Sequence, residues 1–263
     1  MKKQLMAVLL VLTLIAVLTP QPSSAIDAPP AAVEGAPVEL RLENVEIDST
    51  LLELDSAPRM LEATALLQLD DGSYEGSLGV GGTREFLFLN RFTPDPGLFP
   101  FELNEIWAGF PSATGVEVGD DVDLVVYEDA DGNPANGATF RARYSVTILA
   151  LDAWNAYGLT TPLTMAGPGD VLIGVIARET PGSDYFPAAL DRTISQQRSW
   201  VGMWSTSPPP NPPNLPADYS FGLVDSFGYP GNWMVRGYGE ALGSSPVLSW
   251  PADTNYEQDG LHP

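Results

Sequence analysis

An acidic segment at residues 128–133, EDADGN, has the residue types and spacing of a calcium-binding loop. Asp129, Asp131 and Asn133 stand at alternate positions, as in the opening of an EF-hand loop, and Ca²⁺ prefers such oxygen ligands. The segment is not an EF-hand, because the twelfth position, which requires Glu, holds Phe140. The alternative is a β-hairpin turn, for which Asp-Gly and Asn-Pro are common. We favour the turn and keep Ca²⁺ as the only cofactor that the sequence suggests.

Aromatic side chains form a second candidate site, a stacking surface for sugar rings. Sugars pack their C–H faces on aromatic rings, while Asp, Asn and Arg bind the hydroxyls. Most aromatic residues should be core residues, because they dominate burial and no disulfide supports the fold. We expect Trp154 and Tyr157, in the loop-like segment 152–158, to be the most exposed. The candidate ligand-binding residues are Trp154, Tyr157, Trp200, Trp204 and Trp233, with Trp107 and Tyr238 in the wider set.

The side chains that most enzymes use are missing between the two ends of the chain. Lys2 and Lys3 are the only lysines, His262 is the only histidine, and there is no cysteine. The interior therefore lacks Cys or His nucleophiles and bases, Ser-His-Asp triads, lysine Schiff bases, Cys/His zinc sites and disulfides. We predict that the protein is not an enzyme and has no catalytic residues.

Paired carboxylates are the one catalytic chemistry left open. A glycoside hydrolase needs only two of them, and 34 Asp and Glu residues make close pairs common. No pair stands in a recognisable motif, so a carboxylate-dependent glycoside hydrolase is the least favoured alternative. The formal net charge of −22 argues against a nucleic-acid partner, which requires a cationic surface.

The elements that must position these residues are β-strands. Residues 139–148 alternate without a break, with Phe140, Tyr144 and Ile148 among the residues on one face, which is typical of a half-buried strand. A strand at 101–110 has a phase break near Asn104. The other strand candidates are Val38–Leu42, Arg84–Phe92, Asp121–Glu128, Asp170–Arg178, Ser199–Ser205 and Asn232–Tyr238.

Short strands joined by Gly- and Pro-rich turns predict an all-β fold, an antiparallel β-sandwich of jelly-roll-like type. Ser56–Leu69 stays open, because its composition favours a short helix whereas its apolar residues also alternate as in a strand. The proline-rich segment Ser207–Pro216 should be an extended surface loop. We favour a rigid connection there over a loop that docks a partner or covers a ligand.

The N-terminus has the layout of a secretory signal peptide. Lys2 and Lys3 precede an apolar run from Leu5 to Leu18, and Ser23-Ser24-Ala25 is a small-residue cleavage site. A membrane anchor is the alternative, but prolines end the run before the ~20 residues that a spanning helix needs. We predict no membrane insertion after cleavage and a secreted location, extracellular or periplasmic. The expected organisation is a signal peptide at 1–25, a linker at 26–37, a β-sandwich at 38–240 and an acidic flexible tail at 241–263.

Six segments of the chain, taken in order, carry a resemblance to a known kind of domain. They are LNRFTP (Leu89–Pro94), VVYEDADGNPANGA (Val125–Ala138), DVLIGV (Asp170–Val175), PAALDRT (Pro187–Thr193), RSWVGMW (Arg198–Trp204) and SFGYPGNWMVRG (Ser226–Gly237). From about Asp70 to Gly239 the chain resembles an uncharacterised secreted bacterial β-sandwich domain found in exported proteins. The resemblance implies a jelly-roll-like fold in a bacterial exported protein and no catalytic residue.

The sequence thus favours a secreted, non-enzymatic binding module. Its expected partner is a polysaccharide or cell-surface glycan, with Ca²⁺ as a candidate stabilising ion. The alternative is a structural or adhesive exported protein that assembles with other modules. The oligomeric state is left open by the sequence.

Overall fold

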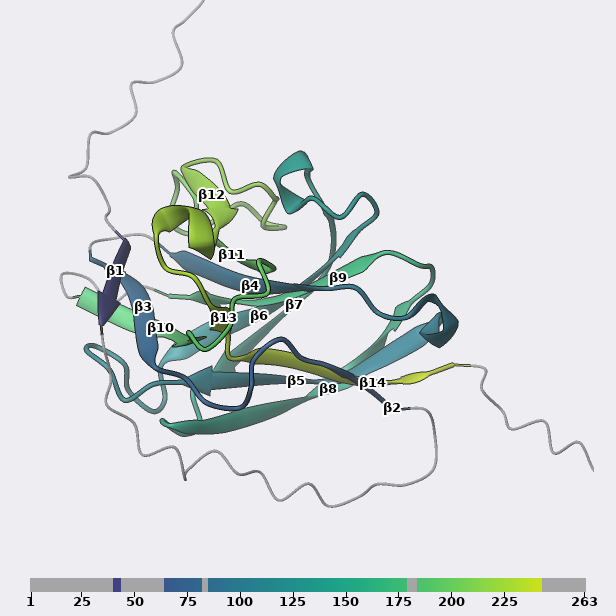
Figure 1. The fold of residues 1–263 in the computed structure, drawn as a ribbon, viewed down its shortest axis with the longest axis horizontal. Helices are drawn as coiled ribbons and strands as arrows, with labels where there is room; N and C mark the ends of the chain where they lie inside the picture. Colours follow the sequence, from purple (N-terminus) through teal and green to yellow (C-terminus); the bar gives the residue numbers. More distant parts are fainter. Residues whose placement is uncertain (1–39, 44–63, 82–84, 179–183, 243–263) are drawn as a thin grey trace, which may run out of the picture. The chain divides into compact units, whose positions relative to one another are not determined.

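A computed structural model describes residues 40–43, 64–81, 85–178 and 184–242 (Figure 1). The predicted signal peptide, the linker and residues 243–263 of the predicted tail lie outside these ranges, and so do residues 56–63. Among the described residues, no helix has the length and apolar character needed to cross a membrane.

The fold is all-β and antiparallel, as predicted, and forms three sheets (Figure 1). The six-stranded sheet has the order β12 (Ser220–Leu223), β11 (Ser199–Met203), β4 (Phe86–Phe92), β9 (Asp170–Ala177), β6 (Asp121–Asp129), β7 (Thr139–Thr147). A four-stranded sheet has the order β2 (Thr64–Leu67), β14 (Val235–Ala241), β5 (Phe101–Phe110), β8 (Ala153–Met165). A second four-stranded sheet has the order β1 (Leu40–Glu43), β3 (Gly76–Gly81), β10 (Asp184–Asp191), β13 (Asn232–Trp233). Helical structure in the described part is confined to the 3₁₀ turns η2 (Pro96–Leu98), η3 (Pro134–Asn136) and η4 (Val224–Phe227).

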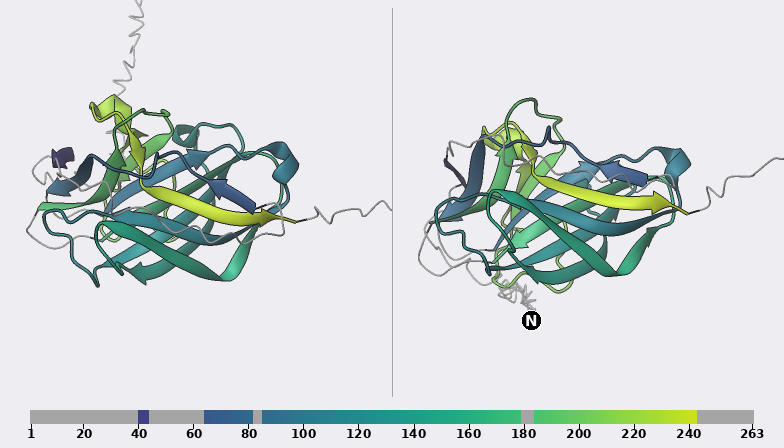
Figure 2. Two further views of the ribbon diagram at one scale, coloured as in Figure 1. Left: turned by 60° about the horizontal axis from the view of Figure 1, so that its bottom comes forward. Right: turned by 90° about the horizontal axis from the view of Figure 1, so that it is seen from below.

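The main core lies between the six-stranded sheet and the β2-β14-β5-β8 sheet, and the third sheet closes one end of it (Figure 2). The central strands of the six-stranded sheet are apolar on both faces. Phe86 and Phe88 of β4 point into the main core, whereas Leu87 and Leu89 point to the opposite face. Successive strand residues point to opposite faces, so a strand with two apolar faces needs a cover on both sides.

The proline-rich segment supplies much of that second cover. Leu215 and Ala217 are buried against the outer face of the six-stranded sheet. The Tyr127 hydroxyl donates to the Pro213 carbonyl oxygen at 3.0 Å, and Trp204 Nε1 donates to the Asn214 carbonyl oxygen at 3.2 Å. The segment therefore packs on the sheet as part of the fold, which goes beyond the rigid surface connection that we expected.

Strand β7 has the predicted bounds to within one residue, but its faces differ from the prediction. The register with β6 shifts between Val126 and Tyr127, and the shift leaves Arg141 without an opposite residue. Phe140 consequently packs against Tyr127 in the outer cluster, whereas Tyr144 packs against the main core. The expectation that Phe140 and Tyr144 share one face is wrong, because a β-bulge reverses the alternation.

Two further local predictions are settled by strand pairing. Residues 64–67, part of the segment left open between helix and strand, form β2, which pairs with β14. The strand alternative is thus correct for these four residues, since pairing with β14 overrides their helix propensity. The phase break near Asn104 is confirmed, because β5 shifts register between Leu103 and Glu105.

Candidate functional site

The outer face of the β2-β14-β5-β8 sheet presents partly exposed aromatic side chains. Strand β5 places one of them there through its register shift. Leu103 points into the core before the shift, and Ile106 and Ala108 point into it afterwards. The alternation therefore changes phase, and Trp107, half-buried between two buried neighbours, faces outward.

Trp107 and Tyr238 form a stacked pair on this face. Their ring centroids are 6.1 Å apart and their planes lie 3° from parallel. Because stacked carbon atoms touch at about 3.5–4.0 Å, the two rings are offset sideways, and neither covers the whole of the other. Tyr238 stands opposite Glu105 on β5 and Leu66 on β2, and Leu66 is 48% exposed. An apolar strip thus crosses three strands.

Arg236, the cross-strand partner of Trp107, joins this pair to Trp154 on β8. Its guanidinium carbon lies 4.1 Å from the ring centroid of Trp154, a cation–π contact. Arg236 Nε donates to both carboxylate oxygens of Asp70 at 3.1 Å, and Nη2 donates to Oδ1. Burial raises the pKa of Asp70, and the contact with Arg236 opposes that rise. The ion pair fixes the guanidinium and, through it, the Trp154 ring.

We call Trp107, Trp154, Arg236 and Tyr238 the aromatic face. Polar groups lie beside it: Trp107 Nε1 donates to Glu105 Oε2 at 3.0 Å, and Asn104 Nδ2 donates to Glu240 Oε1 at 3.2 Å. The cross-strand partners of Trp107 and Glu105 on β8 are Ala156 and Gly158, which are small and exposed. A Cβ built at Gly158 would meet no atom within 4 Å, so the space above Gly158, the cross-strand partner of Glu105, is open.

The structure separates the predicted ligand-binding residues into two groups. Trp200, Trp204, Trp233 and Tyr157 are buried, with exposed fractions of 8% or less, and they pack in the two core clusters. Trp154 alone of the five lies on the aromatic face. The expectation that residues 152–158 form a loop is wrong for 153–158, which belong to β8, and alternation turns Tyr157 inward.

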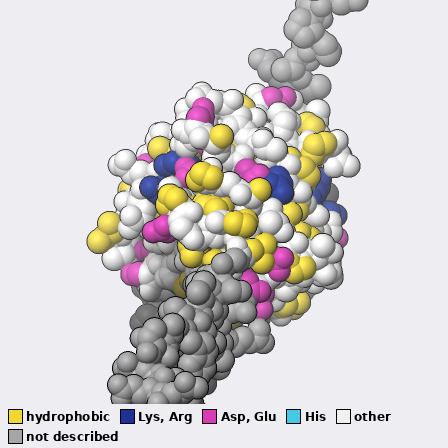
Figure 3. Space-filling model, turned by 90° about the vertical axis from the view of Figure 1, so that its right-hand side faces the viewer, with side chains coloured by type: hydrophobic (Ala, Val, Ile, Leu, Met, Phe, Trp, Pro, Cys, Tyr) yellow, Lys and Arg dark blue, Asp and Glu magenta, His cyan; other side chains and the backbone are white. Residues whose placement is uncertain are grey.

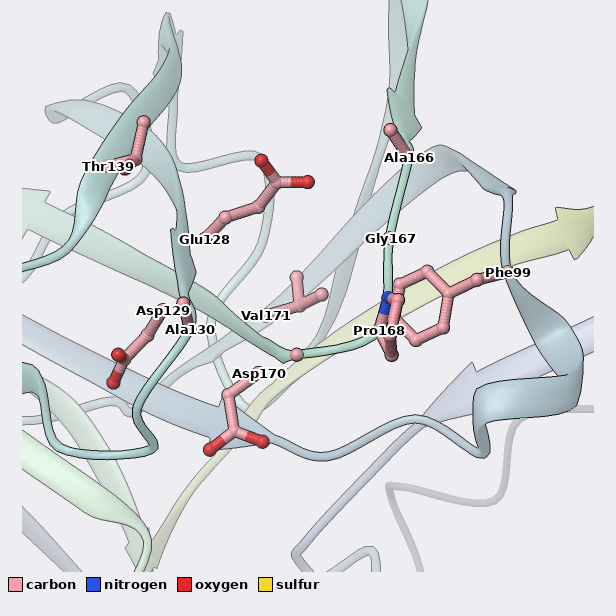
Figure 4. Close-up of a pocket in the computed structure, with 11 residues that line it drawn as sticks. Phe99, Glu128, Asp129, Ala130, Thr139, Ala166, Gly167, Pro168, Asp170 and Val171 are labelled. Atoms are coloured by element: carbon pink, nitrogen blue, oxygen red, sulfur yellow. The ribbon is translucent and has the colours of Figure 1, made fainter.

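A small pocket of about 210 Å³ opens at the end of β6 (Figure 4). It is smaller than the roughly 300–1,000 Å³ of most small-molecule sites. The Glu128 carboxylate projects into its mouth and pairs with Arg141. The pocket is lined by Phe99, Glu128, Asp129, Ala130, Thr139, Ala166, Gly167, Pro168, Gly169, Asp170 and Val171.

On the side of the molecule seen in Figure 3, hydrophobic side chains gather at the centre, with acidic and Arg side chains around them.

The acidic segment forms the turn that follows β6. Asp129 Oδ1 accepts from the Asp131 amide at 3.1 Å, and Asp131 Oδ1 accepts from the Asn133 amide at 2.9 Å. Asn133 caps η3, with Oδ1 accepting from the Ala135 amide. The backbone of this segment therefore forms the turn between β6 and β7 that the sequence favours. No three His, Cys, Asp or Glu side chains gather as a metal-binding group within the described ranges, and the Ca²⁺ prediction stays a prediction.

Electrostatics differ between the two aspartates of this turn. Burial raises the pKa of Asp129, and the adjacent Asp131 carboxylate adds to the rise. A hydrogen bond from Asn136 lowers the pKa of Asp131, with help from the Asn133 amide. Asp129 is 2% exposed, and its Oδ2 has no hydrogen-bond partner.

No protein-family model matches the sequence, and no curated protein matches it. One similar solved structure is the crystal structure of the cysteine protease and lectin-like domains of Cwp84, a surface layer associated protein of Clostridium difficile. The likeness has a TM-score of 0.48 at 11% identity, and covers 68% of this chain and 36% of that chain. This chain thus spans little more than a third of that structure. This chain also has no cysteine, and the likeness carries no inference about its function.

Proposed function

We propose that the protein is a secreted, non-enzymatic module that binds a neutral polysaccharide through the aromatic face. The observation that carries the proposal is the stacked pair Trp107 and Tyr238, held half-exposed on the outer face of a rigid sheet. Partly exposed aromatic rings on strands offer sugar rings a preorganised apolar surface at little cost in conformational entropy.

The groups around the rings support a carbohydrate as the ligand. Glu105 and Glu240 place carboxylate acceptors next to the stack, where sugar hydroxyls can donate to them. Arg236 is held by Asp70, so its charge is compensated within the protein. The small residues Ala156 and Gly158 leave room for an extended chain across β5 and β8.

Charge favours a neutral polymer over an anionic one. The chain has a formal net charge of −22, and the carboxylates beside the stack have the same sign as uronate or sulfate groups. Like charges at an interface weaken association and slow the encounter, more strongly at low salt. We therefore expect uncharged polysaccharides to bind more tightly than acidic ones at the same salt concentration.

The test is a fluorescence titration of the purified chain with a panel of neutral and acidic polysaccharides. Trp107 and Trp154 lie on the aromatic face, whereas Trp200, Trp204 and Trp233 are buried. A bound neutral sugar should shift or quench the emission of the partly exposed tryptophans. Unchanged emission across the panel would contradict the proposal, and a response limited to acidic polymers would contradict its charge argument.

A further inference from the structure

We propose that the turn after β6 is a Ca²⁺ site in which the Asp129 and Asp131 carboxylates are the charged ligands. The site is separate from the aromatic face and does not depend on the proposed glycan binding. The key observation is the Asp129 Oδ2 atom, which is buried and has no hydrogen-bond partner. An unsatisfied buried carboxylate oxygen is costly, and such groups are normally paired or coordinate a metal.

The Asp129 side chain is turned into the bend of the loop that follows it (Figure 4). Its Oδ1 atom accepts from the Asp131 amide at 3.1 Å, so Oδ2 is the carboxylate oxygen that is left without a partner. The Asp131 carboxylate stands two residues further along the same turn, where its Oδ1 accepts from the Asn133 amide at 2.9 Å and its Oδ2 accepts from Asn136 Nδ2 at 3.0 Å. Two adjacent carboxylates with one unsatisfied oxygen are the arrangement that a divalent cation stabilises.

Charge pairing around the turn singles out the same two residues. Asp170 is neutralised by Arg91, whose Nη1 lies 2.5 Å from Asp170 Oδ2, and Glu128 is neutralised by Arg141. In the part of the chain that the structure describes, neither Asp129 nor Asp131 forms an ion pair with an arginine. The turn thus keeps two negative charges, which match the charge of Ca²⁺.

Neutral oxygens near these carboxylates suit a hard cation. Asn133 Oδ1 is available in the same turn, since an amide oxygen has two lone pairs and one of them accepts from Ala135. Ca²⁺ takes six to eight oxygen ligands and accepts carbonyl and water oxygens among them. Weak sites of extracellular modules have dissociation constants of about 10⁻⁴–10⁻³ M, and a site with two carboxylates should fall in that range.

The Arg91 side chain offers an alternative to Ca²⁺ as the partner of the Asp129 carboxylate. A Cβ built on Gly132 would lie 3.1 Å from Arg91 Nη1, so the guanidinium lies against the turn at Gly132. Arg91 Nε is also buried without a hydrogen-bond partner. A water molecule that bridges Arg91 Nε and Asp129 Oδ2 would satisfy both atoms without any metal. This bridge is the alternative that the experiment must separate from a Ca²⁺ site.

The experiment is a calorimetric titration of the whole chelator-treated chain with CaCl₂, alongside thermal melting with and without Ca²⁺. The wild type should bind a single Ca²⁺ and melt at a higher temperature when the ion is present. Asp129→Asn and Asp131→Asn should each weaken binding by at least about tenfold, since even outer-shell changes cost 10–100-fold. Asp131 is exposed, so its variant should fold even if the Asp129 variant does not.

Asp95→Asn is the matched control. Asp95 is an exposed turn residue whose Oδ1 accepts from the amide two residues on, as in Asp129, and this variant loses the same charge. It should bind Ca²⁺ like the wild type. Absence of binding heat and of a melting shift in the wild type would overturn the proposal in favour of the water bridge. An undiminished shift in Asp131→Asn would overturn it too, because the ion would then bind elsewhere.

Discussion

Arg236→Met should destabilise the protein strongly, because it leaves the Asp70 carboxylate buried without its partner. The Asp70 side chain is 0% exposed and that of Arg236 is 9% exposed. Three hydrogen bonds join the two side chains across 166 positions of sequence. Methionine keeps much of the apolar stem of arginine while removing every donor.

The expected loss in the free energy of unfolding is about 3–5 kcal/mol at pH 7, the usual cost of removing one partner of a buried ion pair. The lost cation–π contact with Trp154 adds about 0.5–2 kcal/mol. Domains of this kind have total stabilities of about 5–15 kcal/mol, so the variant should be marginal. Asp70→Asn in the same chain should recover most of the loss, since Asn Oδ1 can still accept from the Gly72 amide.

The assay is urea unfolding of the wild type, the single variant and the double variant between pH 4 and pH 7. Burial already raises the pKa of Asp70, and loss of Arg236 removes the contact that opposes the rise. A raised folded-state pKa favours folding at low pH, and that contribution disappears as pH rises through the folded value. The deficit of Arg236→Met should therefore shrink as the pH falls and Asp70 takes up a proton.

A deficit below about 1 kcal/mol at pH 7 would refute the reasoning, because it would mean that Asp70 is not trapped in a desolvated site. A deficit that stays constant from pH 7 to pH 4 would also refute it. In that case the loss would come from packing of the arginine stem and not from an unpaired carboxylate.

Two further changes probe other parts of the fold. Burial alone would raise the pKa of Asp123, but hydrogen bonds from Arg143, Arg178 and Ser145 lower it overall. The ionised Asp123 should stabilise the protein above its unfolded pKa of about 3.9, and this contribution should be lost as the pH falls through the lower folded pKa. In urea unfolding at acidic pH, the stability of Asp123→Asn should therefore fall less steeply with decreasing pH than that of the wild type. Tyr127→Phe leaves a buried carbonyl of the proline-rich segment without its donor, and should cost about 1–3 kcal/mol in the same assay; no measurable cost would show that the segment does not pack on the sheet.

The sequence predicts the sheet architecture well where alternation or apolar runs are long. Strands β4, β6, β9 and β11 agree with the predicted ranges to within a few residues. Their two apolar faces also explain why their patterns show little alternation, because one face meets the main core and the other meets the proline-rich segment. The partner of that second face cannot be predicted from local pattern, since it depends on a contact between segments far apart in sequence.

Only part of the aromatic face can be predicted from the sequence. The phase break at Asn104 is visible in the sequence, and it implies that Trp107 faces away from Ile106 and Ala108. The sequence does not predict the strand that carries Trp154, since we expect a loop at 152–158, whereas residues 153–158 belong to β8. Pairing with β5 holds the residues on both sides of Thr160, Thr161 and Pro162 in an edge strand, and these three lie in the irregularity between the paired stretches, where proline is tolerated.

Burial of the other tryptophans follows from tertiary packing. Trp200 on β11 and Trp204, one residue beyond its end, pack on the same side, as their spacing predicts, but that side lies under the proline-rich segment. Trp233 reaches the core through β13, where Nε1 donates to the Trp200 carbonyl oxygen at 2.8 Å. Where no bulge intervenes, spacing predicts which residues share a face, whereas the identity of the buried face depends on the neighbouring sheet.

The central claim is that a neutral polysaccharide stacks on the aromatic face, and its most direct test compares affinities among variants. For a polysaccharide that the wild type binds, Trp107→Ala and Tyr238→Ala should each raise the dissociation constant by at least about tenfold, as for aromatic anchors of other interfaces. Phe227→Ala, which removes an aromatic ring 37% exposed on η4, should bind like the wild type. Equal affinity of the Trp107 and Phe227 variants, measured on chains with wild-type melting temperatures, would contradict the claim.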